Sequence, residues 1–126
     1  MKTATFMSVL AIAAVAASSV LAAPAVKTMD SSKGSVLTGA KSMTLYTFEK
    51  DSKGMSSCYD TCATNWPPFM AAKGDKASGA YTLVKRKDGS EQWAKDGMPL
   101  YYWIKDKKAG DVTGDGVNGV WHVAKP

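Results

Sequence analysis

Apolar side chains follow two different patterns along the chain. Residues 6–22 form a nearly continuous apolar run, whereas short apolar segments separated by polar turns occupy the chain from residue 35 onward. Aromatic and β-branched side chains dominate residues 44–48 (TLYTF) and 100–104 (LYYWI), and residues 120–124 (VWHVA) resemble them. This composition and spacing predict β-strands, so we expect a mostly β fold.

Turn signals separate these predicted strands. Asp88-Gly89 and Asp96-Gly97 each predict a β-hairpin, and residues 35–48 have the pattern of a strand, a tight turn and a second strand. Alternation along residues 44–48 and 100–104 predicts two central strands covered on both faces. Irregular loops are expected over residues 52–65 and 107–119, with a short helical turn near Cys58 and Cys62.

A shift of 55 residues places one half of the chain on the other without a gap. It aligns Tyr46 with Tyr101, Phe48 with Trp103, Asp51 with Asp106, and Trp66 with Trp121. We therefore predict two copies of one unit, at about residues 33–70 and 88–125. Each unit alone would leave an apolar face uncovered, so the two are expected to pack together around a pseudo-two-fold axis.

The first 22 residues have the pattern of a secretory signal peptide. Lys2 precedes the apolar run, and small residues follow it, which predicts cleavage after Ala22 or after Ala25. We expect a flexible segment over residues 23–34 and one domain over residues 35–126, with no transmembrane segment once the leader is removed. The predicted location is periplasmic or secreted.

Charge narrows the range of partners. The formal net charge is +5, but lysines and arginines alternate with acids and form no long basic run. This arrangement is typical of a solvated surface and argues against nucleic acid as a partner. An unknown envelope component or a small ligand is the expected partner, and the oligomeric state is open.

The repeated motif residues are interpreted as mainly structural. An aspartate that leaves a strand can accept hydrogen bonds from nearby backbone N–H groups and start a turn, which is the role expected for Asp51 and Asp106. Buried aromatic rings contribute large areas to a small core. We expect most aromatic residues of the motif, and the tryptophan that follows each motif, to lie in that core. They are Tyr46, Phe48, Trp66, Tyr101, Trp103 and Trp121.

The same stretches carry a family resemblance. LYTFEKD followed by NWPP, and then LYYWIKD followed by GDVTGDGVNGVWHVAKP, resemble a bacterial exported family that has a Tyr-x-aromatic-x-x-Asp motif. Its members are described as predicted lipoproteins or secreted repeats. The resemblance implies a periplasmic or cell-surface domain of two repeats and brings no reaction or ligand. The chain lacks a cysteine at the leader exit, so it departs from the lipoprotein pattern.

Two cysteines define the main alternative. Cys58 and Cys62 are four residues apart, and in an oxidising compartment such a pair is expected to form a disulfide. The alternative is either a metal-binding protein in which Cys58 and Cys62, with or without His122, hold copper, or a thiol-redox protein that uses the cysteine pair. The disulfide interpretation needs no cofactor, and the metal-binding alternative needs copper.

Other chemistry has weaker support in the sequence. His122 is the one histidine and lies in an apolar strand pattern, without the motifs of a hydrolytic triad or a phosphate loop. Asp111, Asp115 and Asn118 lie in a glycine-rich loop that lacks the order of an EF-hand. We therefore expect a protein that is not an enzyme, with an envelope-associated binding or protective role.

Overall fold

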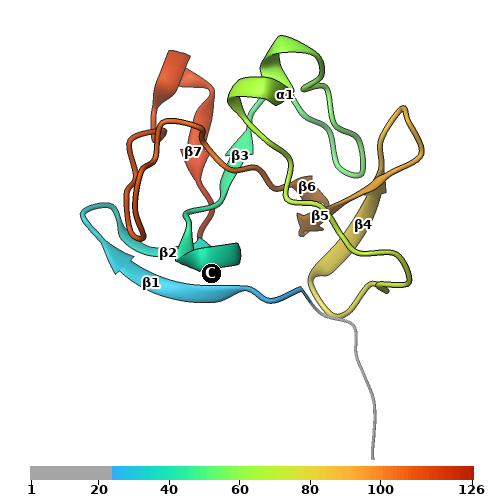
Figure 1. Cartoon of the computed structure of the whole chain (residues 1–126), viewed down its shortest axis with the longest axis horizontal. Coiled ribbons are helices and arrows are strands. Elements are labelled where there is room, and N and C mark those ends of the chain that lie inside the picture. The colour runs from blue at the N-terminus through green and yellow to red at the C-terminus, as the bar shows by residue number, and fades with distance from the viewer. Residues whose placement is uncertain (1–23) are drawn as a thin grey trace, which may run out of the picture.

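The structure is a computed structural model that describes residues 24–126, so the predicted signal peptide lies outside the described residues. The described chain is mostly β, with short helical turns (Figure 1). No described helix is long and apolar enough to cross a membrane. In chain order the elements are β1 (Lys27–Ser31), β2 (Gly34–Thr38), η1 (Ala40–Ser42), β3 (Tyr46–Phe48), α1 (Thr61–Asn65), β4 (Tyr81–Lys85), β5 (Glu91–Lys95), β6 (Met98–Pro99), η2 (Val117–Gly119) and β7 (Trp121–Val123).

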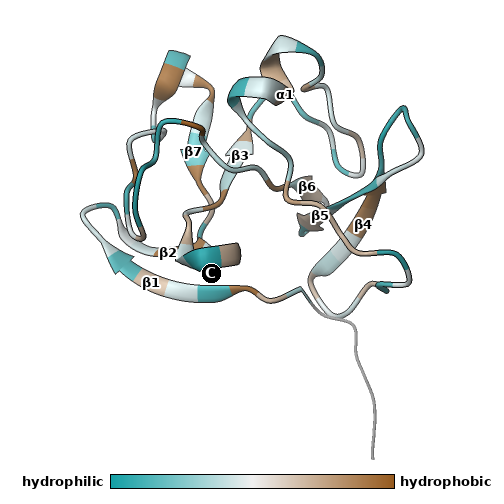
Figure 2. Cartoon of the chain, viewed as in Figure 1, coloured by the Kyte–Doolittle hydropathy of each residue, from teal (hydrophilic) through white to brown (hydrophobic). Residues whose placement is uncertain are grey.

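Each repeat begins with a hairpin. β1 pairs with β2, and β4 pairs with β5, both antiparallel. The hairpins predicted at Asp88-Gly89 and Asp96-Gly97 are present, and both residues of the second turn have positive φ. The turn that joins β4 to β5 is hydrophilic and projects from the body of the molecule (Figure 2).

The segment predicted to be flexible, residues 23–34, contains a β-strand. Residues 27–31 form β1, which pairs with β2 along its whole length. Most side chains of β1 are exposed, so the segment lacks the apolar alternation that identifies a strand. Backbone pairing with β2 holds it in place instead.

The pseudo-two-fold axis passes between the two motif tyrosines. The Tyr46 N–H donates to the Tyr101 carbonyl at 2.8 Å, and the Tyr101 N–H donates to the Tyr46 carbonyl at 3.0 Å. An antiparallel pair that exchanges both bonds has a local two-fold axis at its centre. The two residues are 55 positions apart in sequence, so this axis relates one repeat to the other.

Residues 100–104 do not form the strand that their composition predicts. β3 pairs with β7, and Thr47 lies opposite His122 in that ladder. The equivalent pairing in the second repeat places Tyr102 opposite Pro67. The Tyr102 N–H donates to the Pro67 carbonyl, and the Ile104 N–H donates to the Asn65 carbonyl. Because proline has no N–H to return the bond, Tyr101 keeps only isolated bridges to Tyr46 and Pro68.

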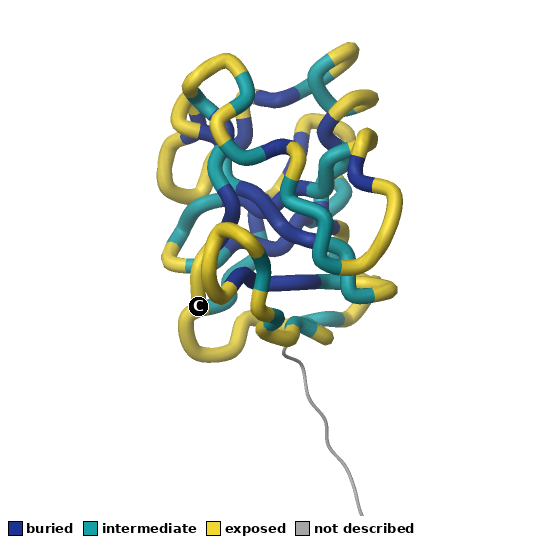
Figure 3. Tube along the Cα trace, turned by 90° about the vertical axis from the view of Figure 1, so that its left-hand side faces the viewer, coloured by how far each residue is buried: buried dark blue, intermediate teal, exposed yellow. Residues whose placement is uncertain are grey.

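The core has two layers, one on each face of the motif segments. Tyr46, Phe48 and Tyr101 point into one layer, and Leu45 and Leu100 point into the other, as strand alternation predicts. Buried segments run through the centre of the molecule and exposed ones form the turns (Figure 3). The leucine layer also contains Leu37, Phe69, Trp93 and Ala124.

Four aromatic rings stack in a column across the other layer. Phe48 stacks on Trp121 at 4.1 Å, Trp121 on Trp66 at 3.8 Å, and Trp66 on Trp103 at 3.9 Å between ring centroids. The column is itself two-fold symmetric, because the central pair and the two end rings are each related by the 55-residue shift. Trp66 and Trp121 are 4% and 3% exposed, whereas Trp103 is half-buried.

Position in the column predicts the cost of losing each ring. Trp121→Ala should lower the free energy of unfolding by about 3–5 kcal/mol, because the ring is buried and stacked on both faces. Trp103→Ala removes a half-buried end ring and should cost about 2 kcal/mol. Urea unfolding followed by circular dichroism measures both values. Equal losses for the two variants would contradict this account of the column.

Candidate functional site

Each motif tyrosine bonds the motif aspartate of the other repeat. The Tyr46 hydroxyl donates to Asp106 Oδ2 at 2.7 Å, and the Tyr101 hydroxyl donates to Asp51 Oδ2 at 2.6 Å. Both aspartates are buried, at 7% and 8% exposure. The motif therefore joins the two halves of the protein through its side chains as well as through its backbone.

The second oxygen of each aspartate organises the loop that follows it. Asp51 Oδ1 accepts bonds from the Ser57 backbone N–H and hydroxyl, at 2.8 and 3.0 Å. Asp106 Oδ1 accepts the equivalent bonds from Thr113, at 3.0 and 2.6 Å. The turn role expected for both aspartates matches these bonds, but the sequence analysis missed the tyrosine partners, because a bond between repeats leaves no local signal.

Burial and the aspartate bonds shift the titration of both phenols. Burial, helped by the hydrogen bond to Asp106, raises the pKa of Tyr46 far above its usual range. Burial, helped by the bond to Asp51, raises the pKa of Tyr101 in the same direction. Both hydroxyls therefore remain protonated donors over any physiological range of pH.

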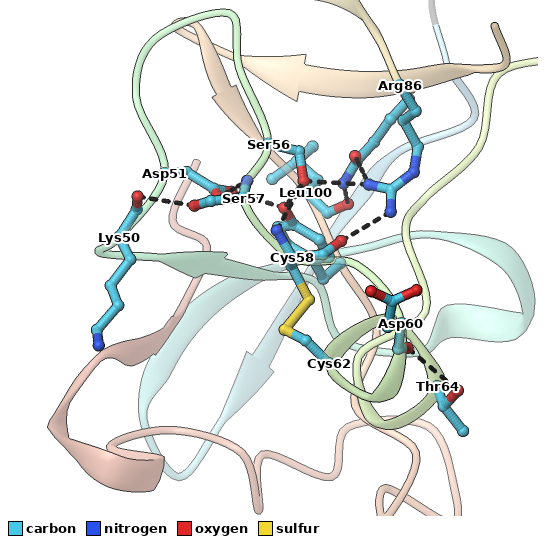
Figure 4. Close-up of a disulfide and its surroundings, with 12 residues drawn as sticks. Lys50, Asp51, Ser56, Ser57, Cys58, Asp60, Cys62, Thr64, Arg86 and Leu100 are labelled. Atoms are coloured by element: carbon cyan, nitrogen blue, oxygen red, sulfur yellow. Dashed lines mark hydrogen bonds between the residues drawn. A yellow bond between two sulfur atoms is a disulfide. The ribbon is translucent and has the colours of Figure 1, made fainter. Parts of the chain in front are cut away.

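The cysteines form the predicted disulfide, and the loop that carries it is tied to the core through Arg86 (Figure 4). The buried guanidinium donates to the Ser56 hydroxyl at 3.1 Å, to the Gln92 side-chain carbonyl at 2.7 Å and to the Cys58 carbonyl at 2.7 Å. Ser56 in turn lies 2.6 Å from the Tyr101 hydroxyl. A continuous chain of hydrogen bonds thus runs from the Arg86 cation to the Asp51 carboxylate.

The structure does not bring His122 together with the cysteines as a metal site. Its side chain lies on the face of β7 opposite to Trp121 and pairs with Glu49. Among residues 24–126 there is no group of three or more His, Cys, Asp or Glu side chains able to hold a metal ion.

The aspartates weighed for calcium serve the backbone instead. Asp111 accepts bonds from the N–H groups of Lys107 and Lys108, and Asp115 accepts one from the N–H of Val123. These bonds make Asp111 and Asp115 turn-forming residues of the loop that leads into β7.

A cleft of about 450 Å³ opens where the loops of both repeats meet. α1 and the segment that leads into β7 lie at the same end of the molecule, at the top of Figure 1. The cleft is bounded by ring atoms of the buried column and by polar side chains from both loops. Its lining residues are Phe48, Lys50, Thr61, Cys62, Asn65, Trp66, Asn118, Val120 and Trp121.

Sequence reasoning reached only part of this site. It identified Phe48, Trp66, Trp121 and the cysteines, although as core and disulfide residues rather than as walls of a cleft. It missed the rim residues Lys50 and Asn65 and considered Asn118 only as a calcium ligand. Polar residues in a loop look the same whether or not the fold turns them toward a cavity.

Comparison with known sequences identifies the repeat. Residues 27–70 and 82–125 each match one sequence family, described as a secreted repeat of unknown function (Lipoprotein_15). The chain belongs to this family. No curated protein and no solved structure is detectably similar to the chain.

The family assignment fits the geometry of the two repeats. Each match begins at the first or second residue of a hairpin's first strand. These starts lie six residues before the repeat boundaries, 33 and 88, predicted from the 55-residue shift. One repeat of this secreted family therefore comprises a hairpin, a motif segment and the loop that ends at the column tryptophan.

The raised phenol pKa values predict a loss of stability in alkali. Above pH 10 the unfolded tyrosines lose protons while the folded ones keep theirs, so each should remove up to about 1.4 kcal/mol per pH unit from the free energy of unfolding. Below pH 10 the contribution is present in full. The double variant Tyr46→Phe, Tyr101→Phe should be less stable at neutral pH, and its free energy of unfolding should fall less steeply as the pH rises above 10. Urea unfolding of both proteins below and above pH 10 measures this difference. If the free energy of unfolding falls equally steeply with pH in both, the tyrosine–aspartate hydrogen bonds do not have the role described here.

The disulfide should stabilise the domain modestly. Cys58→Ser combined with Cys62→Ser should lower the free energy of unfolding by about 2 kcal/mol, because the bond closes a very short loop. The variant should remain folded, since Arg86 and Asp51 still hold the same loop. Thermal and urea unfolding against the oxidised parent provide the values. Complete unfolding of the variant would show that the disulfide carries the fold.

Proposed function

We propose that this secreted-family chain is a non-catalytic binding domain of the cell envelope, and that the cleft above the aromatic column is its ligand site. The observation that carries the proposal is the meeting of both repeat loops around one cavity with a rigid floor. Its volume of about 450 Å³ lies within the range of small-molecule sites. Loops placed on a rigid scaffold are where proteins most often carry binding function.

The lining chemistry favours binding over catalysis. The side chains that can make polar contacts are Lys50, Thr61, Asn65 and Asn118. They supply hydrogen bonds and one positive charge, and among these described residues no pair is suited to general acid and base roles. A periplasmic or cell-surface setting, with an envelope component or a small metabolite as ligand, fits a secreted family.

One observation favours a second candidate, a thiol-redox role. Cys62 lines the cleft, whereas Cys58 is fully buried, so a thiol in the cleft could reach one sulfur of the disulfide. A structural disulfide is expected to have a potential below about −300 mV, and a redox site would lie well above that value. Equilibration with glutathione and dithiothreitol buffers separates the two.

The binding proposal is tested by nuclear magnetic resonance of the protein labelled with nitrogen-15. We expect soluble acids, amines, sugars and aromatic fragments, added singly, to include ligands whose shifts cluster on the loops of Thr61, Asn65 and Asn118. Asn65→Trp should fill the cleft and abolish those shifts. Thr64→Trp, on the same helix and exposed but outside the lining, is the matched control and should keep them. Shifts that persist in Asn65→Trp would contradict the proposed site.

A further inference from the structure

The charge of the cleft favours negatively charged ligands. Lys50 is its one charged lining residue, and none of the described lining residues carries a carboxylate. Asn65 and Asn118 add amide groups, and Thr61 adds a hydroxyl. A cavity with one positive charge and no opposing acid raises the local concentration of anions.

The aromatic column decides how the tryptophans can meet a ligand. Trp66 is covered on one face by Trp121 and on the other by Trp103, and Trp121 is covered by Trp66 and Phe48. Both rings can therefore line the cleft only with their edges. Ring edges carry the positive part of the aromatic quadrupole, so they favour anions and cannot offer the face that a cation or a stacked sugar needs.

The indole N–H groups of Trp66 and Trp121 have no hydrogen-bond acceptor among residues 24–126. Trp66 and Trp121 are almost completely buried, yet within residues 24–126 neither indole N–H makes a hydrogen bond to the protein. A buried donor without a partner costs free energy that an acceptor can recover. A ligand acceptor within reach of these N–H groups would recover that free energy.

From these three observations we propose that the cleft binds a small amphipathic carboxylate, with its apolar body against Val120 and Phe48 and its carboxylate toward Lys50 and the indole N–H groups. This inference rests on the proposed binding function of the same cleft. It replaces ligand stacking on exposed tryptophan faces, because Trp66 and Trp121 have no free face.

Three probes with one ring system and different charges test the proposal. They are 2-naphthylacetate, 2-(2-naphthyl)ethanol and 2-(2-naphthyl)ethylamine, titrated into the oxidised protein. We expect the acetate to bind most tightly and the amine least. The indole N–H signals of Trp66 and Trp121 should move with the acetate, whereas that of Trp93, which lies in the leucine layer, should stay in place.

The repeat supplies a matched pair of lysine variants. Lys50→Met should raise the Kd for 2-naphthylacetate about two- to fivefold and leave that for the alcohol unchanged. Lys105→Met is the control, because Lys105 is the repeat equivalent of Lys50, is exposed and lies outside the cleft lining. It should change neither Kd.

The outcomes separate this inference from the binding proposal. If the amine binds in the cleft as tightly as the acetate, or if both lysine variants weaken the acetate equally, the preference for carboxylates is wrong while the cleft remains a binding site. If none of the probes moves signals of the cleft residues, the carboxylate inference is overturned as well, and the Asn65→Trp screen decides whether the cleft binds anything.

Discussion

The exchange of hydrogen bonds between the repeats is the constraint on which the structure depends. Tyr46 and Tyr101 pair through their backbones, and each hydroxyl satisfies a buried aspartate of the other half. A single repeat would leave its phenol and one oxygen of its carboxylate without a partner in an apolar layer, which is costly. The motif is therefore a device for joining two repeats, and it explains why the chain carries it twice.

The column of rings follows from the same symmetry and determines what the cleft can do. Because Trp66 and Trp121 are related by the axis, they meet face to face on it, and the end rings Phe48 and Trp103 cover their outer faces. The column forms the floor of the cleft, where Trp66 and Trp121 can present only their edges. Polar contacts with a ligand at this end of the molecule then depend on the rim residues of the two loops.

Differences between the halves show where the repeats have acquired separate roles. The first half carries the disulfide, and Arg86 ties that loop to the core, whereas the second half has glycine-rich backbone in the equivalent loop. At Gly114 an added Cβ would come within 2.9 Å of the Tyr46 and Trp66 rings, so a side chain there would collide with the column. The disulfide constrains the first loop, and close packing at Gly114 constrains the second. Two loops of different sequence are thereby held around one cleft.

Sequence alone determined the repeat, the β class and the two faces of the motif segments, because periodicity and residue type act locally. It also indicated the cysteine pair and the hairpin turns, which depend on neighbouring residues. Tertiary structure decided which hydroxyl meets which carboxylate, and it placed β1 in a sheet without an apolar pattern. It also left residues 100–104 with isolated bridges instead of a regular strand, since Pro67, which cannot return the bond from Tyr102, is more than 30 residues away in the chain. Contacts of this kind depend on how distant segments meet, and no local pattern encodes them.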